Sequence, residues 1–149
     1  MPGPVRHVEV VCTGNICRSP IGEVVLRAKL AEAGVDDVIV TSSGTGGWHA
    51  GDPMDPRAAA VLRNRGYDGS AHRAQEFRTS WLPDRDLILA MDETHLTTLR
   101  RKAGPQAPLH LYADQEVPDP YYGEDAGFEE VLDQIEKAAD TWVETLKHH

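Results

Sequence analysis

Features that commit a chain to nucleic acid or to membranes are missing from this sequence. Its 149 residues hold 15 Lys and Arg against 24 Asp and Glu, a formal net charge of −9, and the basic residues form no block. A nucleic-acid partner is therefore not expected. No apolar stretch is long enough to span a bilayer, and the first residues lack the charged and apolar regions of a signal peptide. We predict a cytoplasmic protein with no membrane span.

Cysteine is scarce, and the common cofactor motifs are absent. Cys12 and Cys17 are the only cysteines, which gives no disulfide framework and too few ligands for a structural zinc site. The sequence contains neither the Gly-Lys-Ser/Thr of a nucleotide-binding P-loop nor a GxGxxG fingerprint. We therefore predict a protein of a reducing compartment that uses no metal ion and no cofactor.

The length and the apolar patterning predict a single α/β domain over residues 1–149. Short apolar runs typical of strands alternate with longer helical patterns. The strands are expected at 8–12, 38–42, 87–91 and 109–112, and the helices at 21–33, 57–65, 93–102 and 128–146. This order predicts a four-stranded parallel sheet flanked by helices on both faces, with a ligand site at the carboxyl ends of the strands. His148 and His149 fit either a native terminus or an expression-tag remnant and carry no functional argument.

The most informative segment lies where the first predicted strand ends, at residues 10–20 (VVCTGNICRSP). Arg18 offers a planar fork of donors that suits two oxygens of a phosphoryl group. Pro20 fits the first position of a helix, whose free N–H groups attract anions. Cys12 lies next to that helix end and to an arginine, where a thiol loses its proton more easily and becomes a nucleophile. The segment predicts a phosphate loop between the first strand and the first helix, with a reactive cysteine.

The other residues of the loop fit the same interpretation. Gly14 and Asn15 tolerate positive φ angles, which lets several backbone N–H groups point at one anion. The Ser19 hydroxyl is suited to donate a hydrogen to the thiolate when it leaves. A cysteine and an arginine at this spacing are common by chance, and a cysteine at a strand end is usually an inert buried residue. The complete run of residues is far more specific.

These residues resemble the low molecular weight protein tyrosine phosphatase family. The resemblance rests on residues 11–20 and on residues 119–123 (DPYYG), and it extends over nearly the whole chain. Gly22 departs from the family, which usually has alanine there, and this lowers the expected stability of the first helix. Further matches, in the order and spacing that the family shows, are 41–45, Trp48, Asp52-Pro53, 70–74 and Met91-Asp92.

The resemblance implies a role for each residue of the site. It makes Cys12 the nucleophile, Arg18 the phosphate-binding cation and Asp119 the general acid and base. Ser43 and His72 would join Asn15 in supporting the loop by hydrogen bonds. Substrate would be bound by loop residues and by aromatic walls around its phenyl ring. The loop residues are Thr13, Gly14, Asn15, Ile16 and Cys17, and the walls are Trp48, Tyr121 and Tyr122.

The residues alone leave the identity of the acid open. A leaving alkoxide or phenoxide needs a proton, and a carboxylic acid near the site supplies it. Pro118 and Pro120 restrict the backbone around Asp119, and the resemblance selects that residue. Asp92, which follows a strand and precedes a helix, is predicted to be an N-cap. The acids of the long loop at 113–127 are Asp114, Glu116, Asp119, Glu124 and Asp125.

The leading prediction is a metal-independent protein tyrosine phosphatase. It would hydrolyse phosphotyrosine and small aryl phosphates through a phosphocysteine intermediate. A protein arginine phosphatase is the main alternative, but relatives with that activity tend to have threonine in place of Ile16. A thiol-linked arsenate reductase is less favoured because it needs further cysteines, and none follows Cys17. A phosphopeptide-binding module fits poorly because Cys12 and Asp119 are both present.

Phosphotyrosine-containing proteins are the predicted partners, and the chain is expected to be a monomer or a weak dimer. A tyrosine kinase acting on Tyr121 or Tyr122 is a further candidate partner. Cys12 and Cys17 are close enough in sequence for a reversible disulfide that protects the nucleophile from irreversible oxidation. Cys17 is equally compatible with a role in loop packing, because closeness in sequence does not guarantee disulfide geometry.

Overall fold

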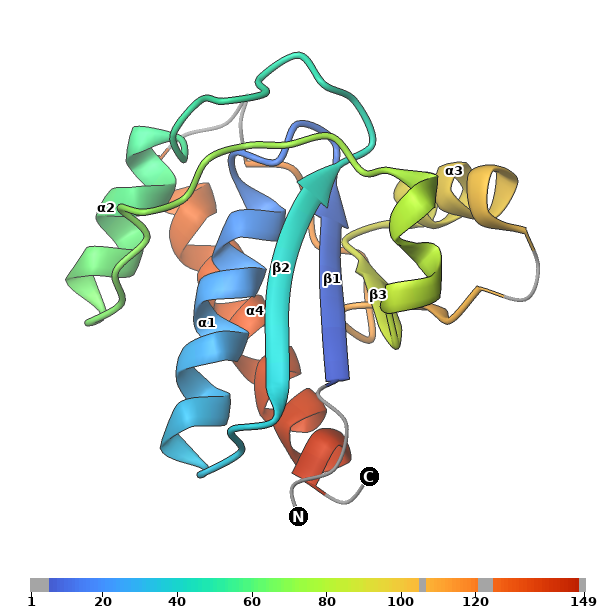
Figure 1. The fold of residues 1–149 in the computed structure, drawn as a ribbon. Coiled ribbons are helices and arrows are strands. Elements are labelled where there is room, and N and C mark those ends of the chain that lie inside the picture. Colours follow the sequence, from blue (N-terminus) through green and yellow to red (C-terminus); the bar gives the residue numbers. More distant parts are fainter. Residues whose placement is uncertain (1–5, 105–106, 121–124, 148–149) are drawn as a thin grey trace.

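The computed structural model describes residues 6–104, 107–120 and 125–147 (Figure 1). Tyr121, Tyr122, His148 and His149 lie outside these ranges, so the structure does not bear on the predictions made for them. Strands and helices alternate along the described chain. Their bounds are β1 (Arg6–Cys12), α1 (Arg18–Glu32), β2 (Val38–Gly44), α2 (Pro56–Asn64), a 3₁₀ helix η1 (Thr79–Asp84), β3 (Leu87–Ala90), α3 (Glu93–Ala103), β4 (Leu109–Leu111) and α4 (Asp125–Lys147).

The four strands form one parallel sheet, as predicted, in the order β2-β1-β3-β4. The chain passes from β1 to β2 on one side and later to β3 on the other side of β1. The direction of winding therefore reverses at the carboxyl ends of β1 and β3, which is where open parallel sheets bind ligands. Cys12 is the last residue of β1 and lies at this reversal.

Helices cover both faces of the sheet because side chains alternate along each strand. Val8, Val10 and Cys12 of β1 belong to the larger core, with α1, α2 and α4. Val11 belongs to the smaller core, with α3 and the segment around η1. Figure 1 shows α1 beside α4 on one face and α3 on the other. None of the helices in the described ranges is long and apolar enough to cross a bilayer.

Two local features differ from the sequence prediction. Pro20 is the third residue of α1, which begins at Arg18, and not the first. Proline is tolerated there because the N–H groups of the first turn have no intrahelical acceptor. The 3₁₀ helix η1 has no predicted counterpart. Its Trp81 packs edge to face on Phe77, with ring centroids 5.8 Å apart, and such a contact leaves no periodic signal in the sequence.

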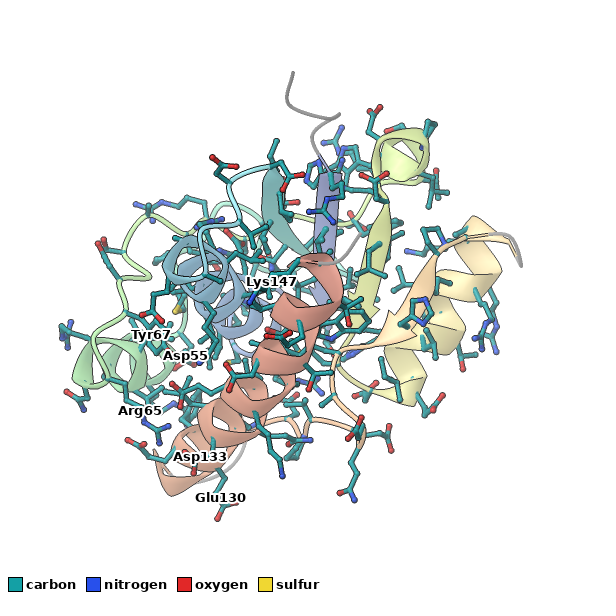
Figure 2. All side chains as sticks on the ribbon, turned by 90° about the horizontal axis from the view of Figure 1, so that it is seen from below. Asp55, Arg65, Tyr67, Glu130, Asp133 and Lys147 are labelled. Carbon is teal, nitrogen blue, oxygen red and sulfur yellow. The ribbon has the colours of Figure 1, made fainter. Side chains whose placement is uncertain are left out.

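Arg65, which follows the last residue of α2, ties that helix to α4 (Figure 2). Its guanidinium lies 2.7 Å from Glu129, 2.6 Å from Asp133 and 2.7 Å from Glu136. The hydrogen bond that Arg65 donates to Glu129, followed by those it donates to the other two carboxylates, raises the pKa of Arg65. Tyr67 donates its hydroxyl to Glu136 at 2.6 Å. Partly exposed ion pairs add little stability individually, but this group fixes the placement of α2 against α4.

Gly22 is buried in α1 against large side chains. A Cβ atom there would lie 2.7 Å from Met91 Cε, 3.0 Å from Val10 Cγ1 and 3.1 Å from Tyr112 Cε2. Replacing a helical glycine by alanine gains about 1 kcal/mol, but forcing a methyl group into a packed core costs about 1–3 kcal/mol. We expect Gly22→Ala to lower the free energy of unfolding by about 1 kcal/mol in urea denaturation. An increase would show that the core relaxes freely around the methyl group.

Candidate active site

The loop between β1 and α1 lines a pocket of about 310 Å³ at the carboxyl end of β1. Every lining residue except His49 was predicted as a site residue. The fold therefore brings the candidate nucleophile, arginine and acid together, although Asp119 is far from Cys12 in the chain. The described residues that line the pocket are Cys12, Thr13, Gly14, Ile16, Cys17, Arg18, Trp48, His49 and Asp119.

Cys12 lies beside the first turn of α1 and is 3% exposed. Its Sγ is 3.0 Å from the Ser19 Oγ. The Ser19 hydroxyl also lies 3.2 Å from the Ser43 carbonyl oxygen, a second acceptor for its single proton. A thiolate on Cys12 attracts that proton more strongly than a carbonyl does, because hydrogen bonds to charged acceptors are stronger. Ser19 is thus placed to stabilise the sulfur when it carries charge.

Asn15 braces the loop from within. It is fully buried and has a φ of 61°, a left-handed conformation that asparagine tolerates. Its side-chain amide donates to Ser19 Oγ at 2.8 Å and to Ser42 Oγ at 2.9 Å. Its Oδ1 accepts a hydrogen bond from the Gln75 backbone N–H at 2.9 Å. These bonds hold the loop in its curved conformation and fix the hydroxyl that faces the thiol.

His72 and Ser43, the two residues predicted to support the loop together with Asn15, contact it in different ways. His72 Nε2 lies 2.7 Å from the Asn15 carbonyl oxygen, and burial lowers the pKa of His72. Ser43 offers its backbone carbonyl to the loop, whereas its buried hydroxyl has no hydrogen-bond partner within the described residues. The Ser42 hydroxyl accepts the Asn15 side-chain N–H at 2.9 Å and donates to Glu23 Oε1 at 2.5 Å. Successive residues of a strand point to opposite faces. The hydroxyls of Ser42 and Ser43 therefore point in opposite directions, and only that of Ser42 contacts Asn15.

Arg18 is buried and its guanidinium is held by fixed acceptors. Nη1 donates to Asp92 Oδ2 and to the Val117 carbonyl, both at 2.9 Å, and Nη2 donates to Thr13 Oγ1 at 3.3 Å. Asp92 also accepts from the His95 backbone N–H at 2.9 Å, which confirms the predicted N-cap of α3. Burial alone would raise the pKa of Asp92, but the hydrogen bonds from the His95 amide and from Arg18 outweigh it and lower that pKa. Asp92 is therefore a carboxylate that fixes one end of the guanidinium.

Asp119 reaches the same pocket from the loop after β4. Its Oδ2 lies 3.6 Å from Arg18 Nη2, and 39% of the side chain is exposed. The Glu116 carboxylate instead accepts the Glu93 backbone N–H at 2.8 Å. Asp114 lines a separate cavity near α4. Among the loop acids whose side chains are described, Asp119 is thus the one that lines the active-site pocket.

Trp48 and His49 form part of the pocket wall. Trp48 is 74% exposed, so its indole is not a core anchor and stands open to a ligand. His49 covers Gly14, where a Cβ atom would lie 2.9 Å from His49 Cδ2. Its Nδ1 lies 3.3 Å from Asp52 Oδ2. Sequence pattern gives no signal for His49, because one polar residue in a glycine-rich loop has no periodicity.

The two cysteines of the pocket are both free thiols, and they differ in their surroundings. Burial, and then the charge of Asp55, raises the pKa of Cys17. Cys17 is therefore a neutral thiol at neutral pH. The reversible disulfide between Cys12 and Cys17 stays a prediction.

The sequence and the fold of this chain have counterparts among known proteins. A family model described as low molecular weight phosphotyrosine protein phosphatase matches residues 7–149. The chain belongs to this family. It is 45% identical over 142 residues to a low molecular weight protein-tyrosine-phosphatase of Streptomyces coelicolor, a match that covers 87% of this chain and 86% of that protein. The family resemblance inferred from the cysteine loop is confirmed.

Solved structures of tyrosine phosphatases share the fold of this low molecular weight phosphatase. A protein tyrosine phosphatase from Entamoeba histolytica, with Hepes in its active site, has a TM-score of 0.92 and 31% identity, covering 96% of this chain and 97% of that one. The tyrosine phosphatase Wzb from Escherichia coli K30, in complex with sulphate, has a TM-score of 0.86 and 34% identity. The match covers 95% of this chain and 99% of that one. The chain is a phosphoric monoester hydrolase of the protein tyrosine phosphatase class, as predicted.

His95 is a buried histidine behind this phosphatase pocket that makes stability depend on pH. Burial and the charge of Arg18 lower the pKa of His95 to about 4. An unfolded histidine has a pKa of about 6.5, so as the pH falls from that value the unfolded state binds a proton that the folded state does not. The contribution of neutral His95 to the free energy of unfolding is complete above the pKa of the unfolded state. It is lost as the pH falls toward the pKa of the folded state.

When the pH is lowered from about 7.5 to about 5, we expect protonation of His95 alone to lower the free energy of unfolding by about 2 kcal/mol. The glutamine of His95→Gln cannot be protonated in this range, so the free energy of unfolding of this variant should fall less at the lower pH. Urea denaturation of both proteins at the two pH values measures the difference. An equal decrease in the free energy of unfolding of the two proteins would contradict this role of His95.

Proposed function

We propose that this phosphatase hydrolyses phosphotyrosine in proteins, and small aryl phosphates, through a phosphocysteine intermediate on Cys12. The observation that carries the proposal is the convergence of Cys12, Arg18 and Asp119 on one pocket. They would be the nucleophile, the cation that binds the phosphoryl oxygens and the general acid. Further support is that the related Wzb was solved with sulphate, a tetrahedral oxyanion.

In the first step of the proposed reaction, the Cys12 thiolate attacks phosphorus of the bound monoester. Arg18 and the N–H groups at the start of α1 bind the phosphoryl oxygens and stabilise the charge of the transition state. The S–P bond forms as the bond from phosphorus to the phenolic oxygen breaks. Protonated Asp119 donates its proton to that oxygen, so tyrosine leaves as a neutral phenol.

In the second step, water attacks phosphorus of the phosphocysteine. The Asp119 carboxylate accepts a proton from this water and returns to its acidic form. The S–P bond breaks with its electron pair on Cys12, and the Ser19 hydroxyl, 3.0 Å from the sulfur, donates to the thiolate. Inorganic phosphate is released and one water is consumed. Since Arg18 and the loop supply the positive charge, we expect full activity in the presence of EDTA.

We further propose that the pocket wall selects an aromatic leaving group. The exposed indole of Trp48 offers a flat apolar face against which a phenyl ring stacks. Tyr121 and Tyr122, outside the described residues, are proposed as the other walls. A shorter phosphoserine would leave these aromatic surfaces uncovered, so it should be a poorer substrate.

Phosphoarginine is the competing substrate class, and Ile16 weighs against it. Ile16 lines the pocket with an apolar side chain, which offers no partner to a guanidinium. We expect kcat/KM for a phosphotyrosine peptide to exceed that for a phosphoarginine peptide by about 100-fold or more. Ile16→Thr should narrow this ratio, whereas Ile39→Thr, at an exposed isoleucine of β2, is the matched control and should not. A wild-type preference for phosphoarginine would overturn the assignment.

The remaining proposals concern location and partners. We place the protein in the cytoplasm, because two free thiols suit a reducing compartment. It would act there as a monomer or a weak dimer on phosphotyrosine-containing proteins. A tyrosine kinase is proposed to modify Tyr121 or Tyr122. Mass spectrometry after kinase treatment tests this last point, and finding neither tyrosine modified would remove it.

A further inference from the structure

We propose that His95 of α3 is a positioning residue that holds Arg18 and Thr13 in the geometry required for oxyanion binding. The inference rests on the proposed function, because it concerns the arginine that binds the phosphoryl group. His95 is not among the residues that line the pocket. It acts from behind the wall, at the first turn of α3.

The two ring nitrogens of His95 face different parts of the site. Nε2 lies 2.7 Å from Thr13 Oγ1 and 3.4 Å from Arg18 Nη2. Nδ1 lies 3.2 Å from Asp92 Oδ1, the same oxygen that accepts the His95 backbone N–H at 2.9 Å. Arginine has donors only, so Nε2 must be the acceptor toward Arg18. The ring proton of the neutral imidazole is then on Nδ1, which faces Asp92 but forms no hydrogen bond within the described residues.

The imidazole supplies an acceptor without a charge. Burial and Arg18 lower the pKa of His95 to about 4, so the ring is neutral at neutral pH. Asp92 already places one negative charge at Nη1 of Arg18. The Asp119 carboxylate lies 3.6 Å from Nη2. A further carboxylate in the place of His95 would weaken the attraction of the guanidinium for a dianion, whereas a neutral nitrogen restricts its rotation and leaves that attraction in place.

His95 also connects three elements of the site. Through Thr13 it contacts the phosphate loop, and through Arg18 it contacts the start of α1. The helix that carries it is held to the acid loop by Glu116, which accepts the Glu93 N–H at 2.8 Å. Without the imidazole, Thr13 Oγ1 and Arg18 Nη2 would lose a shared buried acceptor. Arg18 would then be fixed mainly at Nη1.

Calorimetric titration of the full chain with tungstate, a stable tetrahedral dianion, tests this role. His95→Ala should weaken tungstate binding about tenfold, as expected when a charged group loses a hydrogen bond. His95→Gln places an amide oxygen near the position of Nε2 and should restore most of the affinity. Leu99→Ala is the matched control, because Leu99 belongs to the same helix and is fully buried in the apolar core. It should lower the unfolding temperature and leave tungstate affinity unchanged.

A second variant covers the case in which His95→Ala does not fold. Thr13→Val removes the hydroxyl that contacts His95 with little change in volume, and it should also weaken tungstate binding. In hydrolysis of an aryl phosphate, His95→Ala and Thr13→Val should each raise KM by a factor similar to their loss of tungstate affinity.

Three outcomes separate the possibilities. Wild-type tungstate affinity in folded His95→Ala and Thr13→Val would overturn the inference. An equal loss of affinity in Leu99→Ala would do the same, because it would reduce His95 to a structural residue. A wild-type protein that binds tungstate but hydrolyses no aryl phosphate would overturn the proposed function, with the binding comparison still valid.

Discussion

Cys12→Ser is expected to abolish hydrolysis of p-nitrophenyl phosphate, with a loss of about 10⁴-fold or more in kcat. A serine hydroxyl holds its proton far more tightly than a thiol, and no histidine or carboxylate among the described residues is hydrogen-bonded to Cys12 as a general base. Serine would keep the hydrogen bond to Ser19, so the variant should fold and bind tungstate. Steady-state kinetics in EDTA and reductant, with calorimetry for tungstate, measure both properties.

The matched control for this experiment is Cys17→Ser. Cys17 lies in the same loop, and its buried thiol is neutral because burial raises its pKa. We expect a far smaller loss of kcat in Cys17→Ser than in Cys12→Ser. Comparable losses in the two variants, or turnover by Cys12→Ser, would remove Cys12 from the role of nucleophile.

Asp119→Asn is expected to lower kcat for p-nitrophenyl phosphate by about 100-fold, within the range typical of general acid catalysis. The loss should be larger with phenyl phosphate, because phenol is a weaker acid than p-nitrophenol and depends more on protonation as it leaves. KM should change little, since the carboxylate is 3.6 Å from Arg18 and partly exposed, not a buried anchor. Rates with a series of aryl phosphates measure the dependence on the leaving group.

Asp114→Asn provides the control for the acid. Asp114 belongs to the same loop but lines the separate cavity near α4. We expect its kcat and its dependence on the leaving group to match the wild type. A loss in Asp114→Asn equal to that in Asp119→Asn would assign the effect to the charge or conformation of the loop and not to one proton donor.

Much of the fold follows from local sequence patterns. The period of apolar residues in α4, with Phe128, Val131, Leu132 and Ile135 all buried, predicts that helix and its inner face. The phosphate loop is contiguous, so its cysteine, arginine and helix start are recognisable in one segment. Asp92 is recognisable as an N-cap from its place between a strand and a helix. These features depend on neighbours in the sequence.

The features that the sequence does not reveal depend on contacts between distant segments. His95 approaches Thr13 only because α3 packs beside the phosphate loop. The Val117 carbonyl that accepts from Arg18 is a backbone atom, so its residue type carries no signal. Ser42 contacts the loop through its hydroxyl and Ser43 through its backbone carbonyl. This difference depends on which face of β2 meets the loop, and two adjacent serines look alike in sequence.

The most direct test of the proposed mechanism is to trap the phosphoenzyme. In Asp119→Asn, loss of the general base should slow hydrolysis of the phosphocysteine, so the intermediate should accumulate when p-nitrophenyl phosphate is added. Rapid quenching and mass spectrometry of the tryptic peptide 7–18, which contains both cysteines, locate the modification. The proposed mechanism predicts one phosphoryl group on Cys12 and none on Cys17. Turnover with no phosphoryl group on Cys12, or with one on another residue, would contradict it.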